Sequence, residues 1–398
     1  METQNNTGMK AQTITAQALL QIRTELGQTF LERDEEIDSL LLALLSGQHC
    51  LLLGPPGTAK SALVKDLCQR IGGDYFQWLL TRFTTPEELF GPVSLKALEQ
   101  DQYKRVTTGK LPEANIAFLD EIWKASSSIL NTLLTIINER EFHNNGSAQK
   151  VPLSSLFGAS NELPESEELN ALYDRFLIKH VTKYLADDAS FRAMIQPVNQ
   201  KQITTTTIQE LEKMQAEVRA VDVPEDVLSA LTNLRSLLKK ENIIASDRRY
   251  KQSLELVKAS AYLNGRTTAS IDDLVILQHV LWSQPSEQKT VQKTVINMIN
   301  PTISKAQEIM DIASEIYHAA TDPEIMKDPA RASTAGIEAH VKLKKLSDEL
   351  AAMKVQPASA QKVNAARTKV NGYIQEILSK LLGINTPQTG QDETIKEE

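Results

Sequence analysis

The segment GPPGTAKS, from Gly54 to Ser61, contains the residue types that bind phosphate. Small residues let backbone N–H groups turn toward phosphate oxygens, and a helix that begins near Ser61 adds its positive dipole. In this interpretation Lys60 reaches the β- and γ-phosphates of a nucleotide, and the Ser61 hydroxyl ligates Mg²⁺. The predicted nucleotide-binding residues of the loop are Gly54, Pro55, Pro56, Gly57, Thr58, Ala59, Lys60, Ser61 and Ala62.

One position of this loop departs from the usual pattern, which has glycine directly before the lysine. The residue here is Ala59, and alanine is small enough for the turn to survive. An ordinary Gly-Pro turn between a strand and a helix is the alternative interpretation. It leaves the Lys–Ser pair at the helix start unexplained.

Two carboxylates, Asp120 and Glu121, directly follow the apolar run 116–119. The carboxyl ends of parallel strands are where α/β sheets bind ligands. Asp120 would hold Mg²⁺, directly or through water, and Glu121 would polarise the water that attacks the γ-phosphate. A strand followed by an acidic helix start is the alternative. The phosphate loop earlier in the chain favours the catalytic interpretation.

Asn161 ends a third apolar run, Leu156 to Ser160, and would orient the attacking water beside Glu121. Capping of the strand end by asparagine explains it equally well. Arg175 is a candidate arginine finger that acts on the nucleotide of a neighbouring subunit. A solvated surface residue is the alternative for a lone arginine.

Two further arginines, Arg248 and Arg249, lie in the first turn of a helix that Ser246 would cap. Cations there oppose the helix dipole, so the placement suits a nearby anion such as a γ-phosphate. A surface arginine pair with Asp247 is the alternative.

Short apolar runs alternate with helical patterns in the first half of the chain. The runs His49 to Leu53, Ile116 to Leu119 and Leu156 to Ala159 predict buried parallel strands. A helical pattern, for example over Ser126 to Arg140, lies between them. This alternation predicts an α/β sheet with helices on both faces. After about residue 190 only helical patterns follow.

These patterns divide the chain into five predicted parts: a disordered N-terminus over 1–11, an α/β nucleotide-binding core over 12–195, an all-α lid over 196–284, a C-terminal helical region over 285–385 and a disordered tail over 386–398. Polar residues over 283–293 predict a linker after the lid. Three amphipathic stripes in the C-terminal region predict a helical hairpin or a three-helix bundle. The second stripe contains Ile337, Val341, Leu346, Leu350 and Met353.

Composition excludes several classes of protein. Lys plus Arg is 43 and Asp plus Glu is 51, so the net charge of −8 argues against a DNA-coating or membrane-surface protein. Two cysteines, Cys50 and Cys68, cannot form a disulfide framework or a four-thiolate zinc site. No signal peptide or membrane helix is evident, which predicts a cytoplasmic protein. Six histidines show no metal-ligand spacing, which favours surface or core roles: His49, His143, His180, His279, His318 and His340.

The order of these motifs resembles the MoxR family of AAA+ ATPases, most closely its RavA branch. The matching stretches are GPPGTAKS at 54–61, TRFTTPEELFGPVS at 81–94, TTGKLPEANIAFLDEIWKASSSILNTLLTIINER at 107–140, GASNELPE at 158–165, LYDRF at 172–176 and SDRRYKQS at 246–253. They lie between about residues 50 and 282.

The resemblance implies an AAA+ P-loop core, an all-α lid, and the cofactors ATP or ADP and Mg²⁺. It assigns Lys60 and Ser61 to Walker A, and Asp120 and Glu121 to Walker B. Asn161 matches sensor 1 and Arg175 the arginine finger. Arg248 best matches sensor 2, with Arg249 as the fallback.

The resemblance also implies a ring, usually a hexamer, that acts as a chaperone-like ATPase on a partner with a von Willebrand factor A domain. An insert over 86–109 and a hairpin over 143–150 would face the ring pore. The branch's inserted small β-domain is not evident. A nucleic-acid motor is a second hypothesis, disfavoured because the hairpin has one lysine and no arginine. A nucleotide-gated scaffold is a third, disfavoured because Glu121 and Arg175 are present.

Overall fold

The computed structural model describes residues 14–164, 167–196, 203–353 and 357–384. The chain forms two compact units, Met1–Gln292 and Lys293–Glu398. The disorder predicted for 1–11 and 386–398 concerns residues outside the described ranges. None of the described helices is both long and apolar enough to span a membrane.

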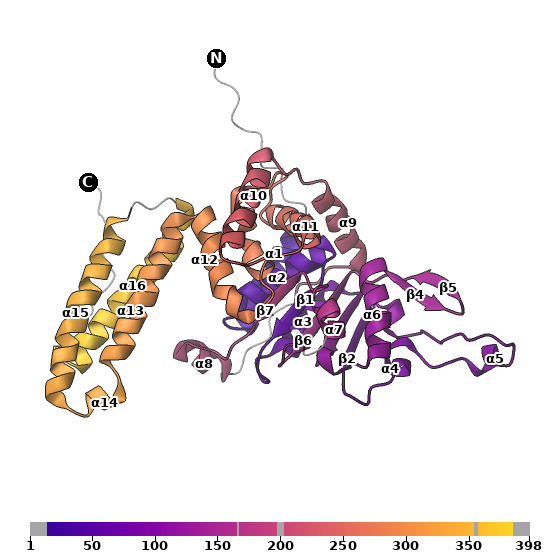
Figure 1. The fold of residues 1–398 in the computed structure, drawn as a ribbon, viewed down its shortest axis with the longest axis horizontal. Helices are drawn as coiled ribbons and strands as arrows, with labels where there is room; N and C mark the ends of the chain where they lie inside the picture. Colours follow the sequence, from indigo (N-terminus) through magenta and orange to yellow (C-terminus); the bar gives the residue numbers. More distant parts are fainter. Residues whose placement is uncertain (1–13, 165–166, 197–202, 354–356, 385–398) are drawn as a thin grey trace, which may run out of the picture. The chain divides into compact units, whose positions relative to one another are not determined.

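A five-stranded parallel sheet forms the centre of the first unit (Figure 1). Its strands, in spatial order, are β2 (Tyr75–Leu79), β3 (Ile116–Asp120), β6 (Ser155–Ser160), β1 (Cys50–Leu53) and β7 (Ile178–Val181). The three predicted strands are confirmed as β1, β3 and β6. Because β6 lies between β1 and β3, the residues that follow these three strands meet at one edge of the sheet.

Two strands were not predicted, β2 and β7. On β2 the side chains of Gln77 and Leu79 are exposed, so the strand lacks a continuous apolar run. On β7 two polar residues, Lys179 and His180, are buried. The Nζ atom of Lys179 lies 3.9 Å from the centre of the Tyr173 ring, and burial lowers the pKa of this lysine to about 6. The two buried polar side chains interrupt the apolar run by which a strand is predicted.

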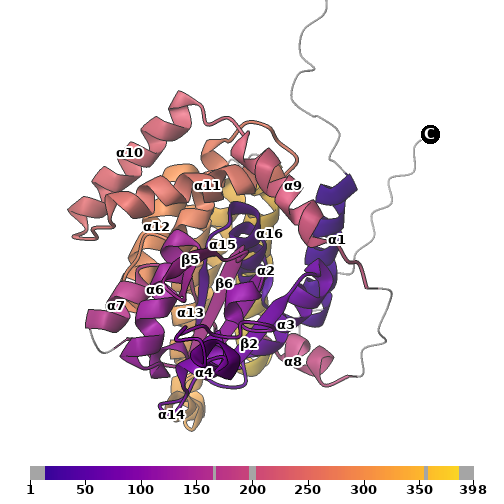
Figure 2. The same ribbon diagram turned by 90° about the vertical axis from the view of Figure 1, so that its right-hand side faces the viewer.

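Helices flank the sheet in the first unit (Figures 1 and 2). Helix α2 packs against β1 and β7, and α3 packs against β3 and β6. The amphipathic pattern predicted over 126–140 is confirmed by α6. The helices up to residue 196 are α1 (Ile14–Thr29), α2 (Asp34–Ser46), α3 (Lys60–Ile71), α4 (Pro86–Phe90), α5 (Leu95–Leu98), α6 (Ser127–Glu139), α7 (Glu167–Tyr173) and α8 (Asp188–Met194), with 3₁₀ turns η1 (Leu111–Glu113) and η2 (Ile122–Lys124).

The predicted hairpin is present as β4 (Glu141–Asn144) and β5 (Ser147–Lys150). Figure 1 shows this hairpin and α5 projecting from the same end of the unit. The buried side chain of Asn144 joins the hairpin to the segment over 86–109. Its Oδ1 accepts from the Arg105 backbone N–H at 2.8 Å, and its Nδ2 donates to the Arg105 carbonyl at 3.2 Å.

Helices alone follow β7 in the described part of the first unit. After α8 they are α9 (Ile208–Arg219), α10 (Glu225–Lys240), α11 (Asp247–Leu263), η3 (Ile271–His279) and η4 (Pro285–Glu287), and α12 (Gln288–Ile299) crosses the boundary between the units. Reciprocal capping boxes start α9 and η3, because the carboxylates of Glu210 and Asp273 accept hydrogen bonds from the backbone N–H groups of the cap residues. The linker predicted over 283–293 is wrong, since η4 and α12 occupy most of it.

The second unit contains three long helices that pack against one another: α13 (Pro301–Ala320), α15 (Pro329–Ala352) and α16 (Pro357–Lys380). A short helix, α14 (Pro323–Met326), precedes α15. Of the two predicted arrangements, the described residues form the three-helix bundle. No strand occurs within 293–353 or 357–384.

The apolar stripe predicted on α15 is partly wrong. Ile337 and Val341 are 56% and 62% exposed, whereas Leu350 is buried as expected. A Cβ atom on Gly336 would meet Cβ of Leu381 at 2.8 Å, so a small residue is needed where the two helices approach. Small residues therefore lie on the buried face of α15, and a prediction from hydrophobicity alone chose the wrong face.

Candidate functional site

The phosphate loop begins at the carboxyl end of β1, which lies between the neighbouring strands β6 and β7. The Gly54 N–H donates to the Ser160 carbonyl at 3.0 Å. Gly54 has a φ of +149°, and a Cβ atom there would lie 2.3 Å from the Thr182 carbonyl oxygen. Only glycine fits this position, both in conformation and in space.

The loop ends in a left-handed residue directly before α3. Ala59 has a φ of 63°, which is the conformation that glycine adopts without strain. Alanine therefore retains the turn at a cost of about 1 kcal/mol. No side chain caps the first turn of α3. Its N–H groups face the loop without a side-chain acceptor at the cap position, which suits an anionic ligand.

Lys60 is folded back into its own loop. Its Nζ atom donates to the carbonyls of Gly54 at 2.6 Å and Pro55 at 2.9 Å, and to the Asn161 Oδ1 at 3.2 Å. Burial lowers the pKa of Lys60, while Asp120 and Glu121 act in the opposite direction. The ammonium group thus lies where the loop, the acidic strand end and Asn161 converge.

Ser61 and Asp120 are brought together across the sheet edge. The Ser61 hydroxyl donates to Oδ2 of Asp120 at 2.8 Å. A hydroxyl beside a carboxylate is a set of hard oxygen donors, the kind that Mg²⁺ prefers. The residues present therefore fit a magnesium ion held with nucleotide phosphates.

Glu121 and Asn161 form the second half of the cluster. The Asn161 Nδ2 donates to Oε1 of Glu121 at 2.7 Å, while its Oδ1 accepts from Lys60. Burial raises the pKa of Glu121, and the neighbouring Asp120 carboxylate raises it further. A raised carboxyl pKa suits a group that accepts a proton from water. Asn161 thus connects the phosphate-binding lysine to the candidate base.

The three arginines of the sequence prediction gather elsewhere, around the turn that follows α7. Arg248 Nη2 donates to Oδ2 of Asp174 at 2.5 Å, and Arg249 Nη2 donates to Oδ1 of the same carboxylate at 2.9 Å. Arg175 is the next residue along the chain, and its buried Nε has no hydrogen-bond partner among the described residues. In the described ranges no hydrogen bond joins these arginines to the phosphate loop.

The two candidate sensor 2 residues differ in burial. The Arg249 side chain is 3% exposed and also donates to the carbonyls of Leu177 and Val280, so it fastens α11 to the start of β7 and to the residue after η3. The Arg248 side chain is 36% exposed and has fewer partners. The Ser246 hydroxyl accepts from the Arg249 N–H at 3.3 Å, as predicted for the cap.

Sequence reasoning missed two residues that hold the loop in place. Arg33 is buried and donates to the Thr58 carbonyl at 3.4 Å and to the Lys183 carbonyl at 2.5 Å. Thr182 packs against Gly54, and its N–H and hydroxyl both donate to the Leu53 carbonyl, at 2.7 and 2.9 Å. Both partners lie far away in sequence, so no local pattern indicated them.

Comparison with known proteins identifies the family. Residues 17–221 match the family described as the MoxR domain in the MoxR-vWA-beta-propeller ternary systems. The chain belongs to the MoxR family of AAA+ ATPases. Residues 226–295 match a second family, the AAA lid domain.

Individual proteins are also similar to this chain, and one of them carries the family name. An uncharacterized protein of Methanocaldococcus jannaschii is 41% identical over 91% of this chain and 98% of its own length. The chaperone MoxR1 of Mycobacterium tuberculosis is 27% identical over 46% of this chain and 50% of its own length. A crystal structure of a candidate ATPase from Cytophaga hutchinsonii superposes with a TM-score of 0.58 at 19% identity, over 72% of this chain and 95% of that one, which supports the fold. The predicted MoxR family and the predicted AAA+ fold are thus confirmed.

Proposed function

We propose that this MoxR-family chain hydrolyses ATP with Mg²⁺ in a cytoplasmic homo-oligomeric ring, a hexamer by family resemblance, and couples the cycle to remodelling of a protein partner. One observation carries the proposal. Asn161 connects Lys60 to Glu121, and Ser61 contacts Asp120, so a phosphate-binding group, a metal-binding pair and a general base lie at one sheet edge.

The nucleotide is bound by the loop from Gly54 to Ala62. Lys60 exchanges the carbonyls of Gly54 and Pro55 for phosphate oxygens, which present negative charge to the ammonium group. Ser61 and Asp120 would hold Mg²⁺, which would supply positive charge to neutralise the phosphates of the nucleotide.

Hydrolysis requires a base and a group that orients it. The Glu121 carboxylate accepts the proton of the attacking water. The Asn161 amide fixes the direction of that carboxylate through the 2.7 Å hydrogen bond. Arg175 acts in trans on the nucleotide of the neighbouring subunit, and Arg248 acts as sensor 2. Arg249 is the fallback sensor, but its buried contacts favour a structural role.

The partner is a protein with a von Willebrand factor A domain. The matched family is described from MoxR-vWA systems, and one relative is named a chaperone. The segment over 86–109 exposes apolar side chains that suit contact with a protein, namely Leu95, Leu98, Tyr103 and Val106. We also propose that the chain belongs to the RavA branch. Its core, lid and C-terminal region would span residues 12–195, 196–284 and 285–385.

A mixing experiment tests catalysis between subunits. We expect Arg175→Ala and Glu121→Gln each to abolish steady-state phosphate release. When the two variants are co-expressed in equal amounts, about a quarter of the sites combine an intact Glu121 with an intact neighbouring Arg175. Phosphate release should then recover to about that fraction of the wild-type rate.

The control is Arg192→Ala, because Arg192 is an exposed arginine on α8. It should release phosphate at the wild-type rate. No recovery in the mixture would contradict an arginine acting in trans. Strong stimulation of the wild type by DNA, lost at high salt, would instead favour a nucleic-acid motor.

A further inference from the structure

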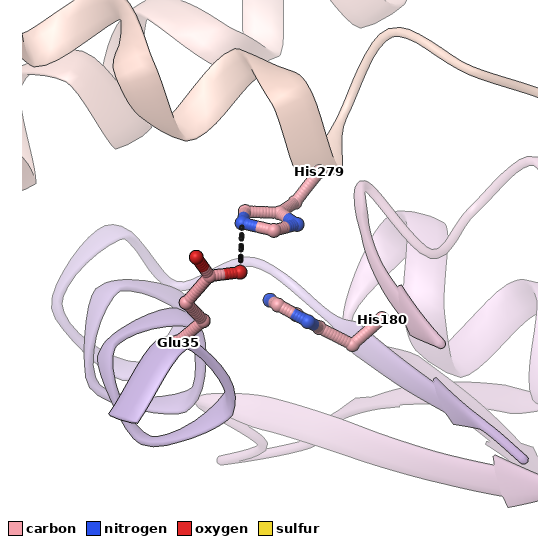
Figure 3. Close-up of side chains that lie close together, drawn as sticks. All are labelled: Glu35, His180 and His279. Carbon is pink, nitrogen blue, oxygen red and sulfur yellow. Dashed lines mark ion pairs between the residues drawn. The ribbon is translucent and has the colours of Figure 1, made fainter. Parts of the chain in front are cut away.

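Three side chains from three separate elements meet on the side of β7 that faces α2 and η3. They are Glu35 on α2, His180 on β7 and His279 on η3 (Figure 3). One ligand atom from each lies within 4.8 Å of the other two. The two imidazole rings stack with centres 3.9 Å apart, and Figure 3 shows the Glu35 carboxylate beside both rings.

The separation between His279 and Glu35 is close to that between two ligands of one metal ion. Ligands about 2.0 to 2.1 Å from a tetrahedral metal lie about 3.4 Å from one another. Nε2 of His279 lies 3.5 Å from the Glu35 carboxylate. The Ser39 hydroxyl lies 2.7 Å from Nε2 of His180 and holds this ring against α2.

Burial keeps the imidazoles in the form that binds metals. His180 and His279 are 3% and 5% exposed, and burial disfavours the charged imidazolium form. Nδ1 of His279 is buried without a hydrogen-bond partner among the described residues. Neutral imidazole is the ligand form. Glu35, at 63% exposure, adds a negative charge and leaves one side open to water.

We propose that Glu35, His180 and His279 bind one divalent transition-metal cation of the Zn²⁺ type, with solvent as the remaining ligand. Two nitrogen donors and one oxygen donor select Zn²⁺ over Mg²⁺, which prefers oxygen. The site is therefore chemically different from the Ser61–Asp120 pair. The histidines are separated by almost a hundred positions in the chain, which is why no ligand spacing appears in the sequence.

The cation would link the α/β sheet to the helices that follow it. Glu35 lies on α2, which packs against the sheet, and His180 lies on β7, whereas His279 belongs to η3, within the segment that matches the AAA lid domain. Neighbouring contacts already join the same parts, for Lys179 Nζ donates to the Trp282 carbonyl at 3.3 Å. A bound cation adds a cross-link to this joint and stabilises the folded unit.

The test is calorimetric titration of nucleotide-free, chelator-treated full-length protein with Zn²⁺ in excess Mg²⁺. We expect one Zn²⁺ per chain, and at least tenfold weaker binding in Glu35→Gln and in His279→Phe. Phe at 279 retains an aromatic ring for stacking on His180. Thermal unfolding should shift upward with Zn²⁺ in the wild type, and by less at the same Zn²⁺ concentration in Glu35→Gln.

The matched control is His143→Ala, because His143, Glu139 and Glu141 form another group within ligand distance. This variant should bind Zn²⁺ like the wild type. Equal Zn²⁺ affinity in the wild type and Glu35→Gln, loss of binding in His143→Ala, or absence of one saturable site would each overturn the proposal. Glu35 is exposed, so Glu35→Gln decides the question even where His279→Phe fails to fold.

Discussion

Replacing Gly54 by alanine tests the close approach on which the phosphate loop depends. The new Cβ atom would lie 2.3 Å from the Thr182 carbonyl oxygen, so loop or strand must move by about 1 Å to reach ordinary contact. Overpacking of this kind costs about 1–3 kcal/mol. The positive φ adds about 1 kcal/mol, which gives a total loss of about 2–4 kcal/mol.

A matched variant separates the two contributions. Gly47 also has a positive φ, at +65°, but a Cβ atom there meets nothing within 4 Å. Gly47→Ala should therefore lose only about 1 kcal/mol. Urea unfolding, monitored by circular dichroism, measures the loss of stability in both variants. Binding of a fluorescent ATP analogue measures whether displacement of the loop weakens nucleotide binding. Equal stability of the two variants, or undiminished ATP binding by Gly54→Ala, would refute the steric argument.

Three further outcomes follow from strained or buried groups. Ala59→Gly should raise the free energy of unfolding by about 0.5–1 kcal/mol in urea, because it removes a left-handed alanine; an unchanged midpoint would contradict this. Lys179→Met should add about 1–3 kcal/mol at pH 7. The wild type, whose folded Lys179 has a pKa of about 6, should gain stability as pH rises from 6 toward 10.5, and the variant should not. Phosphate release should fall as pH drops through the raised pKa of Glu121, since the base must be deprotonated; an acidic limb at an ordinary carboxyl pKa would contradict this.

The parts of the fold that could be predicted are those with local signals. Continuous apolar runs before Gly54, Asp120 and Asn161 predicted three strands, and the sheet order then brings their ends together. β7 escaped prediction because its buried Lys179 is accommodated by the Tyr173 ring and by the carbonyl of Trp282, which lies far away in sequence. The face of α15 was misjudged because close packing at Gly336 outweighs hydrophobicity.

The same distinction holds for the candidate site. Lys60, Glu121 and Asn161 each follow a strand, so their meeting is a consequence of topology that a sequence pattern can anticipate. The supports of the loop, Arg33 and Thr182, act through backbone carbonyls, which any residue possesses. No motif marks such contacts, and only the folded chain reveals them.

The most direct test of the central proposal compares the wild type with Glu121→Gln. Steady-state phosphate release and ATP affinity are measured at neutral pH in excess Mg²⁺. We expect a loss of turnover of at least about a hundredfold, because glutamine cannot accept the proton of the attacking water. ATP affinity should stay close to that of the wild type, since Lys60 and Ser61 are unchanged. Turnover equal to that of the wild type would contradict the assignment of Glu121 as the base.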